Sequence, residues 1–404
     1  MTSQHLAIDL GSHSIKALVA TPEVSGWQVV MPILRKSRGI KTGEIEDIEA
    51  ATEEVDSLLK EMEGLIKGAR FKSIIIGINS PNIDIHLSKG TSVVSRADGV
   101  ISEDDKKRAE KAAQAFALNT NRSLVQTIFK DYLIDGANKV KNPVGLTGLR
   151  LEAEALLIDV FSPVVKNIDL LKEAIGLNNA TKVILSYAGA ELALSDQDKE
   201  VGALALDLGA STTSMAVYEN GELLDLKVFP RGGNNITSDI AIGLKTSIDS
   251  AEEIKVKEGI ALVKKVNRGE SFNLDDYFSE AEKGTKISKK FLAEIIEARL
   301  VEIFDAVGER LKQISRFQKL AGGVILYGGG AKMNFVKELA KERFKLPVRI
   351  AQPDIEWYKE NPDPTFVGVL GLMDLKMKSL EVPILERTSP LGSTWDFIKH
   401  LFSW

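Results

Sequence analysis

The sequence predicts an α/β protein made of two similar halves. An internal repeat is the main observation: Leu6-Ala-Ile-Asp-Leu-Gly-Ser returns as Leu204-Ala-Leu-Asp-Leu-Gly-Ala, and the two aspartates are 198 positions apart in the printed numbering. A late Gly-Gly-Gly turn at 328–330, after a short apolar run, is the second observation. Short Asp-Leu-Gly matches also arise by chance, so two unrelated hairpins are the alternative. The matching flanks favour duplicated halves.

Each copy of the repeat has the pattern of a β-hairpin with a phosphate-binding turn. An apolar strand leads into small residues, and a second apolar strand follows at 15–20 and at 214–218. Gly11 and Gly209 let the backbone come close to a ligand. Hydroxyl donors add to the main-chain N–H groups at Ser12, Ser14, Ser211, Thr212 and Thr213. We expect the two turns to hold a phosphate chain from opposite sides.

Two carboxylates, Asp9 and Asp207, end the first strand of each hairpin. Beside phosphates they would be repulsive unless a cation lies between them. The expected cation is Mg²⁺, held mostly through water.

The third glycine turn follows an apolar strand at 322–327 and precedes a helix expected over 334–344. A strand, a glycine turn and a helix N-terminus recur at nucleotide sites. Glycines also serve close packing of helix on strand, so this turn alone is weak evidence. Together with the two hairpins it predicts a third wall of one site.

Composition excludes several classes of protein. The chain has 404 residues, 44% of them hydrophobic and 27% charged, with four His and no Cys, so zinc or iron–sulfur sites held by Cys are excluded. A net charge of −5 argues against nucleic-acid binding. The N-terminus lacks the pattern of a signal peptide, and no run approaches the roughly 18 apolar residues of a spanning helix. These features predict a cytoplasmic address.

The chain resembles the actin/Hsp70/sugar-kinase superfamily, whose two phosphate loops and adenosine loop occur in this order. Within it the sequence is most similar to the FtsA family of bacterial cell-division proteins. The run from Phe229 to Leu244, with Pro-Arg-Gly-Gly and Ile-Thr-Ser-Asp-Ile-Ala, carries the likeness, as does Ala-Glu-Glu-Ile-Lys at 251–255. The likeness covers nearly the whole chain and is loose at 82–165 and 260–290.

The resemblance implies ATP and Mg²⁺ as ligands. Glu252 and Lys255 fall on the pair that addresses ribose and base, and their i,i+3 spacing puts them on one helix face; a plain surface salt bridge is the alternative. The expected ATP-binding residues are Asp9, Gly11, Ser12, Ser14, Lys16, Asp207, Gly209, Ala210, Ser211, Thr212, Gly233, Asn234, Glu252, Lys255, Gly328, Gly329, Gly330 and Lys332, with Asp9 and Asp207 at the metal.

Two departures from the family pattern concern catalysis. Ser214 stands where relatives usually have a carboxylate, and Ser186 stands near the position of a water-positioning Glu in hydrolytic chaperones. No catalytic base can be named, so we expect ATP binding with slow or negligible hydrolysis.

The resemblance also implies four subdomains. Between strands at 73–78 and 182–185 the sequence predicts strands at 83–87, 91–94, 123–132 and 149–159. It also predicts a helix opened by a capping box at Ser102 and Asp105. This block resembles the FtsA-type subdomain IC. The expected parts are IA (1–81, 166–188 and 364–376), IC (82–165), IIA (189–235 and 316–363), IIB (236–315), a linker (377–391) and an amphipathic helix (392–404).

A long helix over 288–314 is expected within IIB, with an apolar stripe that includes Leu292, Ile303 and Leu311. By resemblance, this subdomain receives the C-terminal tail of the tubulin-like FtsZ. Candidate docking residues are Lys289, Lys290 and Arg299, for which a solvated helix face is an equal alternative.

The last residues have the pattern of a short membrane-surface helix. Apolar side chains share one face, and the segment follows a stretch with two prolines. Few basic residues accompany them, so hydrophobic insertion is the expected main contribution. A helix docked on the protein's own core is the alternative. The expected membrane contacts are Trp395, Phe397, Ile398, Leu401, Phe402 and Trp404.

The combined expectation is an ATP-binding protein that tethers FtsZ filaments to the cytoplasmic face of the bacterial membrane at the division site and polymerises with itself. A PilM-like factor for type IV pilus assembly, which shares the inserted block, is the alternative. A sugar kinase would need a catalytic carboxylate, and residues 82–165 offer no obvious one.

Overall fold

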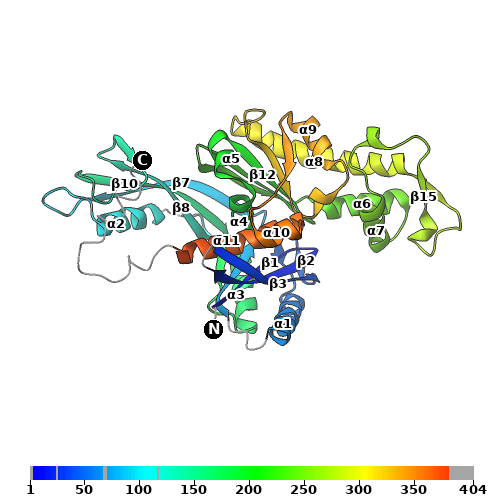
Figure 1. Ribbon diagram of the computed structural model, residues 1–404, viewed down its shortest axis with the longest axis horizontal. Coiled ribbons are helices and arrows are strands. Elements are labelled where there is room, and N and C mark those ends of the chain that lie inside the picture. The colour runs from blue at the N-terminus through cyan, green and yellow to red at the C-terminus, as the bar shows by residue number, and fades with distance from the viewer. Residues whose placement is uncertain (1–2, 24–25, 67–70, 116–117, 382–404) are drawn as a thin grey trace.

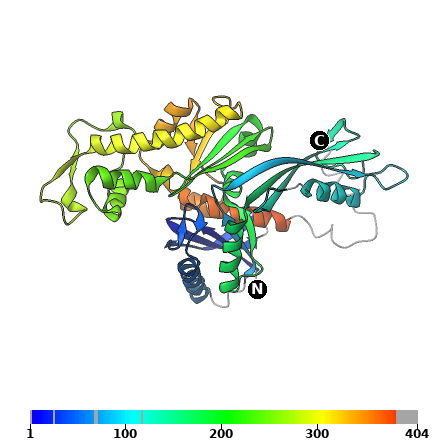
Figure 2. The same ribbon diagram turned by 180° about the vertical axis from the view of Figure 1, so that it is seen from behind.

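A computed structural model describes residues 3–23, 26–66, 71–115 and 118–381. Two five-stranded sheets lie one above the other at the centre of an elongated molecule (Figure 1), and a third, inserted sheet extends to one end. Seen from behind, the inserted sheet and the helices beyond the second sheet again lie at opposite ends (Figure 2). We call the first sheet with its covering helices the first lobe, and the second sheet with its helices the second lobe.

The two central sheets have the same topology, which confirms the predicted duplication. In the first sheet, β1 (Gln4–Leu10), β2 (Ser14–Glu23) and β3 (Gly26–Lys36) form an antiparallel meander. On the other side of β1 lie the parallel strands β6 (Phe71–Ile78) and β11 (Thr181–Ile184).

The second sheet repeats this order. Antiparallel β12 (Ala203–Leu208), β13 (Thr213–Glu219) and β14 (Glu222–Phe229) continue into parallel β17 (Gly323–Tyr327) and β18 (Val348–Ile350). In register, Asp9 is opposite Lys16 and Asp207 is opposite Ser214. The two Asp-Leu-Gly turns are therefore structurally equivalent.

Helices cover both lobes and join them. In the first lobe lie α1 (Ile48–Leu65), α3 (Ser162–Ala174) and α11 (Val367–Glu381). Between the lobes α4 (Leu185–Ala193) packs along α11 so closely that a Cβ at Gly371 would come 2.2 Å from the Ala188 carbonyl oxygen. One face of the second sheet, including Ala203 and Tyr327, therefore shares a hydrophobic core with the first lobe.

The opposite face of the second sheet packs on helices of the second lobe. These are α8 (Lys289–Gln313) and α9 (Val336–Phe344), and α6 (Gly233–Leu244) and α7 (Ile248–Glu258) continue the same core outward. The helix expected over 288–314 is confirmed as α8, and its predicted apolar stripe is buried except for the partly buried Ile295. Short elements complete this end: η1 (Val263–Lys265), β15 (Ser271–Asn273), η2 (Leu274–Asp276) and β16 (Lys286–Ser288).

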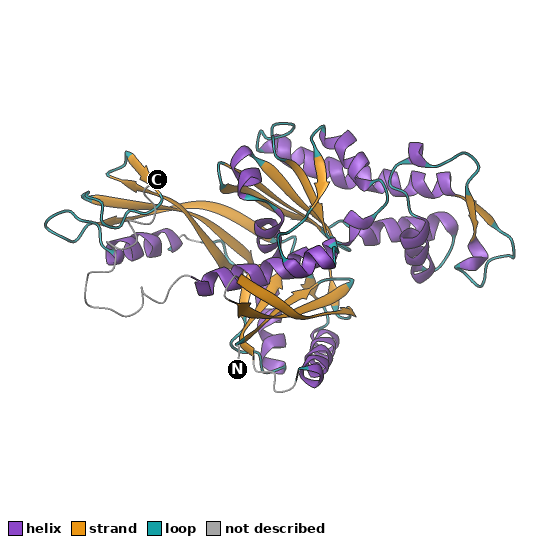
Figure 3. Cartoon of the chain, in the orientation of Figure 1, coloured by secondary structure: helices purple, strands orange, loops and turns teal. Residues whose placement is uncertain are grey.

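The inserted sheet has the order β7, β10, β8, β9, with α2 on one face (Figure 3). Its elements are β7 (Ile83–Val93), α2 (Glu103–Gln114), β8 (Arg122–Ile134), β9 (Asn138–Val140) and β10 (Arg150–Phe161). The capping box predicted at Ser102 and Asp105 is confirmed. The prediction of two strands at 83–87 and 91–94 was wrong, because β7 is continuous.

Four smaller elements and two short hairpin strands finish the described part of the fold. These are α5 (Asp196–Val201), η3 (Gly329–Lys332), α10 (Glu356–Glu360), η4 (Pro364–Phe366), β4 (Ile40–Lys41) and β5 (Glu44–Ile45). Helix α11 continues to Glu381 and buries Met377, so the linker expected from residue 377 does not begin there. The amphipathic helix expected at 392–404, with its membrane residues, lies outside the described residues.

Candidate functional site

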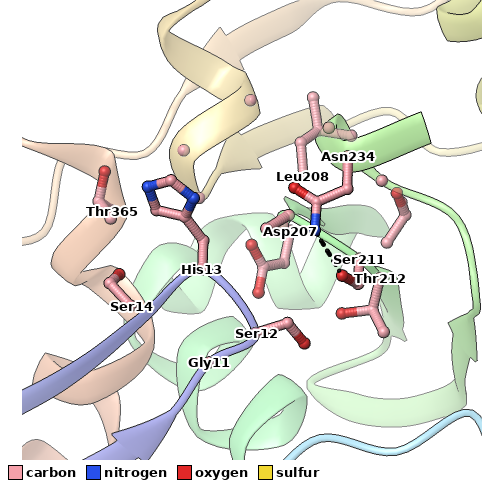
Figure 4. Close-up of a pocket in the computed structure, with 18 of the residues that line it drawn as sticks. Gly11, Ser12, His13, Ser14, Asp207, Leu208, Ser211, Thr212, Asn234 and Thr365 are labelled. Atoms are coloured by element: carbon pink, nitrogen blue, oxygen red, sulfur yellow. Dashed lines mark hydrogen bonds between the residues drawn. The ribbon is translucent and has the colours of Figure 1, made fainter. Parts of the chain in front are cut away.

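The two hairpin turns face each other across a cavity of about 400 Å³ between the lobes. In Figure 4, Gly11 and Ser12 of the first turn lie opposite Ser211 and Thr212 of the second. Residues of α7 and of the glycine turn after β17 line the remaining walls. The structure thus brings the predicted phosphate turns and the predicted third wall to one site.

In the first turn, Asp9 and Lys16 form a buried ion pair. Their side chains are opposite each other in the β1–β2 register, and Lys16 Nζ donates to Asp9 Oδ2 at 2.7 Å. Both residues are less than a tenth exposed. A buried charge is costly unless it is paired, so each side chain depends on the other.

Asp207 of the second turn forms no ion pair with any residue that the structure describes. Burial and the neighbouring Asp9 raise its pKa to about 7, while Lys16 acts in the opposite direction. Its register partner is Ser214, whose hydroxyl donates to Asn79 Oδ1 at 3.0 Å. Two carboxylates with one ammonium group therefore lie at the floor of the cavity.

Asp207 makes the ligand-free protein less stable as the pH rises. Its carboxyl group titrates at 3.8 in the unfolded chain and at about 7 in the folded protein. Between these values the folded state holds a proton that the unfolded state has released, so stability falls with rising pH across this range. Asp207→Asn should flatten the dependence of the unfolding temperature on pH between about 4 and about 7. The exposed control Asp249→Asn should leave it unchanged; an unaltered dependence in Asp207→Asn would contradict this assignment.

The second turn is held by the start of α6. The N–H groups of Gly233 and Asn234 donate to the carbonyl oxygens of Gly209 and Ala210, and Asn234 Nδ2 donates to Ser211 Oγ at 2.9 Å (Figure 4). A Cβ at Gly232 would come 2.6 Å from both carbonyl oxygens. Gly232 is thus required for α6 to close against the turn, and the Asn234 side chain adds a hydrogen bond to Ser211.

Glu252 and Lys255 line the cavity from one face of α7, as their spacing predicted. Lys255 Nζ donates to Glu252 Oε2 at 2.6 Å, to Thr237 Oγ1 at 2.8 Å and to the Gly233 carbonyl oxygen at 3.2 Å. Burial opposes ionisation of Glu252, but Lys255 and Thr237 outweigh it and lower its pKa. The pair is a salt bridge, and it lies within the cavity wall.

The third glycine turn lies against Asp207. Gly328 has a φ of 82°, and a Cβ there would come 2.1 Å from Asp207 Oδ1. Gly329, Gly330 and Lys332 line the cavity within η3, and Lys332 Nζ pairs with Asp363 Oδ2 at 3.0 Å. The helix expected from residue 334 begins at Val336, because the turn first forms η3 and Phe335 then adopts a left-handed conformation.

Several cavity residues were missed by the sequence analysis, among them Gly43 and Asn79. Gly43 is at the tip of the β4–β5 hairpin, where Thr42 and Gly43 both have positive φ, and its N–H donates to Ser12 Oγ at 2.9 Å. Lys-Thr-Gly-Glu at 41–44 has the pattern of a two-residue turn and could have been recognised. Asn79 carries no such local signal. His13 and Thr365, both labelled in Figure 4, also line the cavity.

The three cations proposed to dock a partner lie on α8 and all have carboxylate partners. Arg299 forms a two-pronged pair with Asp239 of α6, at 2.6 and 2.9 Å. Lys289 pairs with Glu258 at 2.8 Å, whereas the exposed Lys290 lies 3.8 Å from Glu294. Arg299 therefore ties α6 to α8, and Lys290 is the most exposed of the three.

Two negative findings concern the described part of the chain. No group of three or more His, Cys, Asp or Glu side chains that could hold a metal ion occurs there. Within the same residues, no helix combines the length and apolar character needed to cross a membrane.

Comparisons with known proteins agree with this architecture. The family model "Cell division protein FtsA" matches residues 204–371, and the model "SHS2 domain inserted in FTSA" matches 82–159. The cell division protein FtsA of Pseudomonas aeruginosa is 30% identical over 86% of this chain and 82% of its own length.

Among solved structures, the PilM–PilN type IV pilus biogenesis complex has a TM-score of 0.62 at 15% identity, covering 92% of this chain and 98% of that chain. MreB5 of Spiroplasma citri bound to ADP has a TM-score of 0.57 at 16% identity, covering 95% and 99%. At these identities the likeness shows the fold alone.

The duplicated sheets, the cavity between them and these neighbours define an actin-like ATPase fold with an inserted SHS2 domain. The sequence relatives narrow this class. The chain belongs to the FtsA family of cell-division proteins.

Proposed function

We propose that the cavity between the lobes binds ATP. The observation that carries the proposal is the meeting of two equivalent Asp-Leu-Gly turns across one cavity, with a glycine turn and the Glu252–Lys255 pair on its other walls. Main-chain N–H groups and hydroxyls of such turns suit phosphate oxygens. The similar fold of an MreB5 bound to ADP supports the same ligand class.

Mg²⁺ fits the floor of this site. Asp9 and Asp207 repel each other enough to contribute to the raised pKa of Asp207, and a cation between them would remove that repulsion. Phosphate oxygens and water would supply further ligands beside these two carboxylates. The metal would neutralise charge on the phosphates.

Hydrolysis is proposed to be slow. The carboxylates that line the cavity are Asp9, Asp207, Glu252 and Asp363. The first two would hold the metal, while Glu252 and Asp363 are already paired with lysines. Ser214, at the position of the missing carboxylate, is engaged by Asn79. None of these four carboxylates is left free to act as a base, so turnover near the ~1 s⁻¹ of slow kinases would contradict this proposal.

The cellular role that we propose is to tether FtsZ filaments to the cytoplasmic face of the membrane at the division site, with self-association into filaments. Membership of the FtsA family supports a role at the division site with FtsZ. The apolar face predicted at 392–404 supports attachment to the membrane, since Trp and Phe insert favourably at a membrane surface. ATP would act by bridging the lobes and so setting the shape that neighbouring subunits recognise.

Lys290 offers a test of FtsZ binding. Its side chain is 67% exposed, and the neighbouring Phe291 and the Ile242 side chain of α6 are also exposed. Lys290→Glu should weaken binding of a labelled FtsZ tail peptide, measured by fluorescence anisotropy, by about fivefold, which is roughly 1 kcal/mol. Arg299 is less suitable because its reversal would also break the Asp239 pair.

Lys312→Glu is the matched control for this test. It makes the same charge change on the same helix, at a side chain that is 54% exposed, near the opposite end of α8. Its affinity for the peptide should stay unchanged. Equal peptide affinities for the wild type and Lys290→Glu would show that this end of α8 is not part of the docking surface.

A pilus-assembly role is the second candidate, favoured by the fold likeness to the PilM–PilN complex. That likeness comes with 15% identity, whereas the FtsA of Pseudomonas aeruginosa shares 30%. We therefore propose the division role as the function.

A further inference from the structure

Asn79 is the first residue after β6 in the first lobe, and its side chain reaches the second lobe. Its Nδ2 donates to Thr212 Oγ1 at 3.2 Å, and its Oδ1 accepts from Ser214 Oγ at 3.0 Å. Both partners flank the second phosphate turn and are less than a tenth exposed. One carboxamide thus binds two buried hydroxyls across the boundary between the lobes.

The main chain of Asn79 also touches the support of the first phosphate turn. A Cβ at Gly43 would come 1.8 Å from the Asn79 carbonyl oxygen, so the two backbones are in direct contact. The Gly43 N–H in turn donates to Ser12 Oγ at 2.9 Å. A chain of contacts therefore runs from Ser12 through Gly43 and Asn79 to Thr212.

The chemistry of these contacts suits an amide. The Ser214 hydroxyl donates to Asn79 and therefore requires an acceptor at residue 79. The Thr212 hydroxyl oxygen accepts an N–H from Asn79 and therefore requires a donor there. A carboxamide supplies both. Since Thr212 accepts the bond from Asn79, its own hydroxyl proton stays available for an acceptor in the cavity that it lines.

We propose that Asn79 is a positioning residue that joins the two phosphate turns and directs the Thr212 hydroxyl toward the phosphates of the bound nucleotide. This inference rests on the proposed ATP binding. It assigns a role to Ser214, which does not line the cavity and acts only through Asn79. Closure of the lobes thereby becomes part of phosphate recognition.

Affinity measurements on Asn79→Ala, Ser214→Ala and the double variant test the proposal. By isothermal titration with Mg²⁺·ATP, Asn79→Ala should bind about tenfold more weakly and Ser214→Ala about threefold, which correspond to roughly 1.4 and 0.65 kcal/mol and lie within the range of neutral hydrogen bonds. The double variant should match Asn79→Ala, because Ser214 acts through that side chain. If the loss of affinity in the double variant were instead the product of the two single losses, the proposal would be overturned.

Adenosine separates positioning from general loosening of the fold. It lacks phosphates, so its affinity should be the same in Asn79→Ala as in the wild type. Equal losses for adenosine and Mg²⁺·ATP would mean a structural role only. Ser186→Ala is the matched control, since it also removes a buried hydroxyl, but one that has no hydrogen-bond partner among the described residues. It should change neither affinity.

A nucleotide-free measurement keeps the inference distinct from the proposed function. The chain has no Cys, so two nitroxide labels can be placed at cysteines substituted for the exposed Lys60 of α1 and Lys257 of α7. Pulsed electron paramagnetic resonance measures the distance between the two labels. Its distribution should be broader for Asn79→Ala and Ser214→Ala than for the wild type or Ser186→Ala.

The possible outcomes differ in what they overturn. If the wild type binds no ATP, the proposed function fails, and the distance distributions still decide whether Asn79 joins the lobes. If ATP binds but both Asn79→Ala and Ser214→Ala behave as the wild type in affinity and distance, the inference fails alone. If Asn79→Ala does not fold, the milder Ser214→Ala decides by the same two measurements.

Discussion

Replacing Lys16 with methionine is expected to abolish Mg²⁺·ATP binding and to destabilise the ligand-free protein. Lys16 is the cation that pairs with Asp9 at 2.7 Å and counteracts the raised pKa of Asp207. Removing one partner of a buried ion pair costs about 3–5 kcal/mol, because the other charge is left unpaired. Titration calorimetry should show no measurable binding, and thermal unfolding should occur at a clearly lower temperature.

A double variant separates the two effects of this change. In Asp9→Asn/Lys16→Met, no uncompensated charge remains at Asp9, so most of the lost stability should return while ATP binding stays absent. Lys16→Met with wild-type affinity would show that the first phosphate turn does not hold the ligand. An unchanged unfolding temperature would show that the Asp9–Lys16 pair is not needed for folding.

Gly328→Ala is expected to have the second largest effect. Gly328 has a φ of 82°, which a side chain makes costly by roughly 1–3 kcal/mol. The new methyl group would also lie 2.1 Å from Asp207 Oδ1 and 2.8 Å from the Leu208 carbonyl oxygen. The variant should lose more than ~2 kcal/mol of stability by denaturant unfolding, and its nucleotide affinity should fall because Asp207 must move.

Gly329→Ala is the matched control at the next position. Outside its own turn, no atom of the described residues lies within 4 Å of a Cβ built there, and its φ is not positive, so the stability of the ligand-free protein should be near that of the wild type. Similar losses in both variants would mean that the turn tolerates no side chain at all. Wild-type behaviour of Gly328→Ala would contradict the geometry described for the third wall.

Local sequence patterns sufficed to predict the parts of the fold that local chemistry determines. The Asp-Leu-Gly repeat identified both hairpins, because alternating apolar residues around a small-residue turn leave few other structures. Ser102 and Asp105 marked the start of α2 through their reciprocal cap. Spacing also placed Glu252 and Lys255 on one face of α7.

The break predicted within β7 failed for a reason of packing. Gly90, between the two predicted runs, lies inside the strand, where α2 approaches so closely that a Cβ would be 1.9 Å from the Ala113 nitrogen. A glycine that allows close approach and a glycine that makes a turn look alike in one sequence.

Contacts between distant segments account for the missed site residues. Asn79 is 133 positions from Thr212, and nothing near it in the sequence marks it as a ligand or bridge. Arg299 shows the converse, since its place on the polar side of α8 suggested a docking cation, whereas Asp239, 60 positions away, holds it. Only the tertiary structure reveals the contact of Asn79 with Thr212 and that of Arg299 with Asp239.

A flotation experiment with labelled FtsZ, liposomes and Mg²⁺·ATP tests the proposed tether most directly. The full chain should carry FtsZ to the top of a density gradient with the liposomes, whereas a chain ending at residue 391 should leave both proteins at the bottom. FtsZ that stays at the bottom while the full chain floats, or that floats equally well with the shortened chain, would contradict the proposed link between filament and membrane.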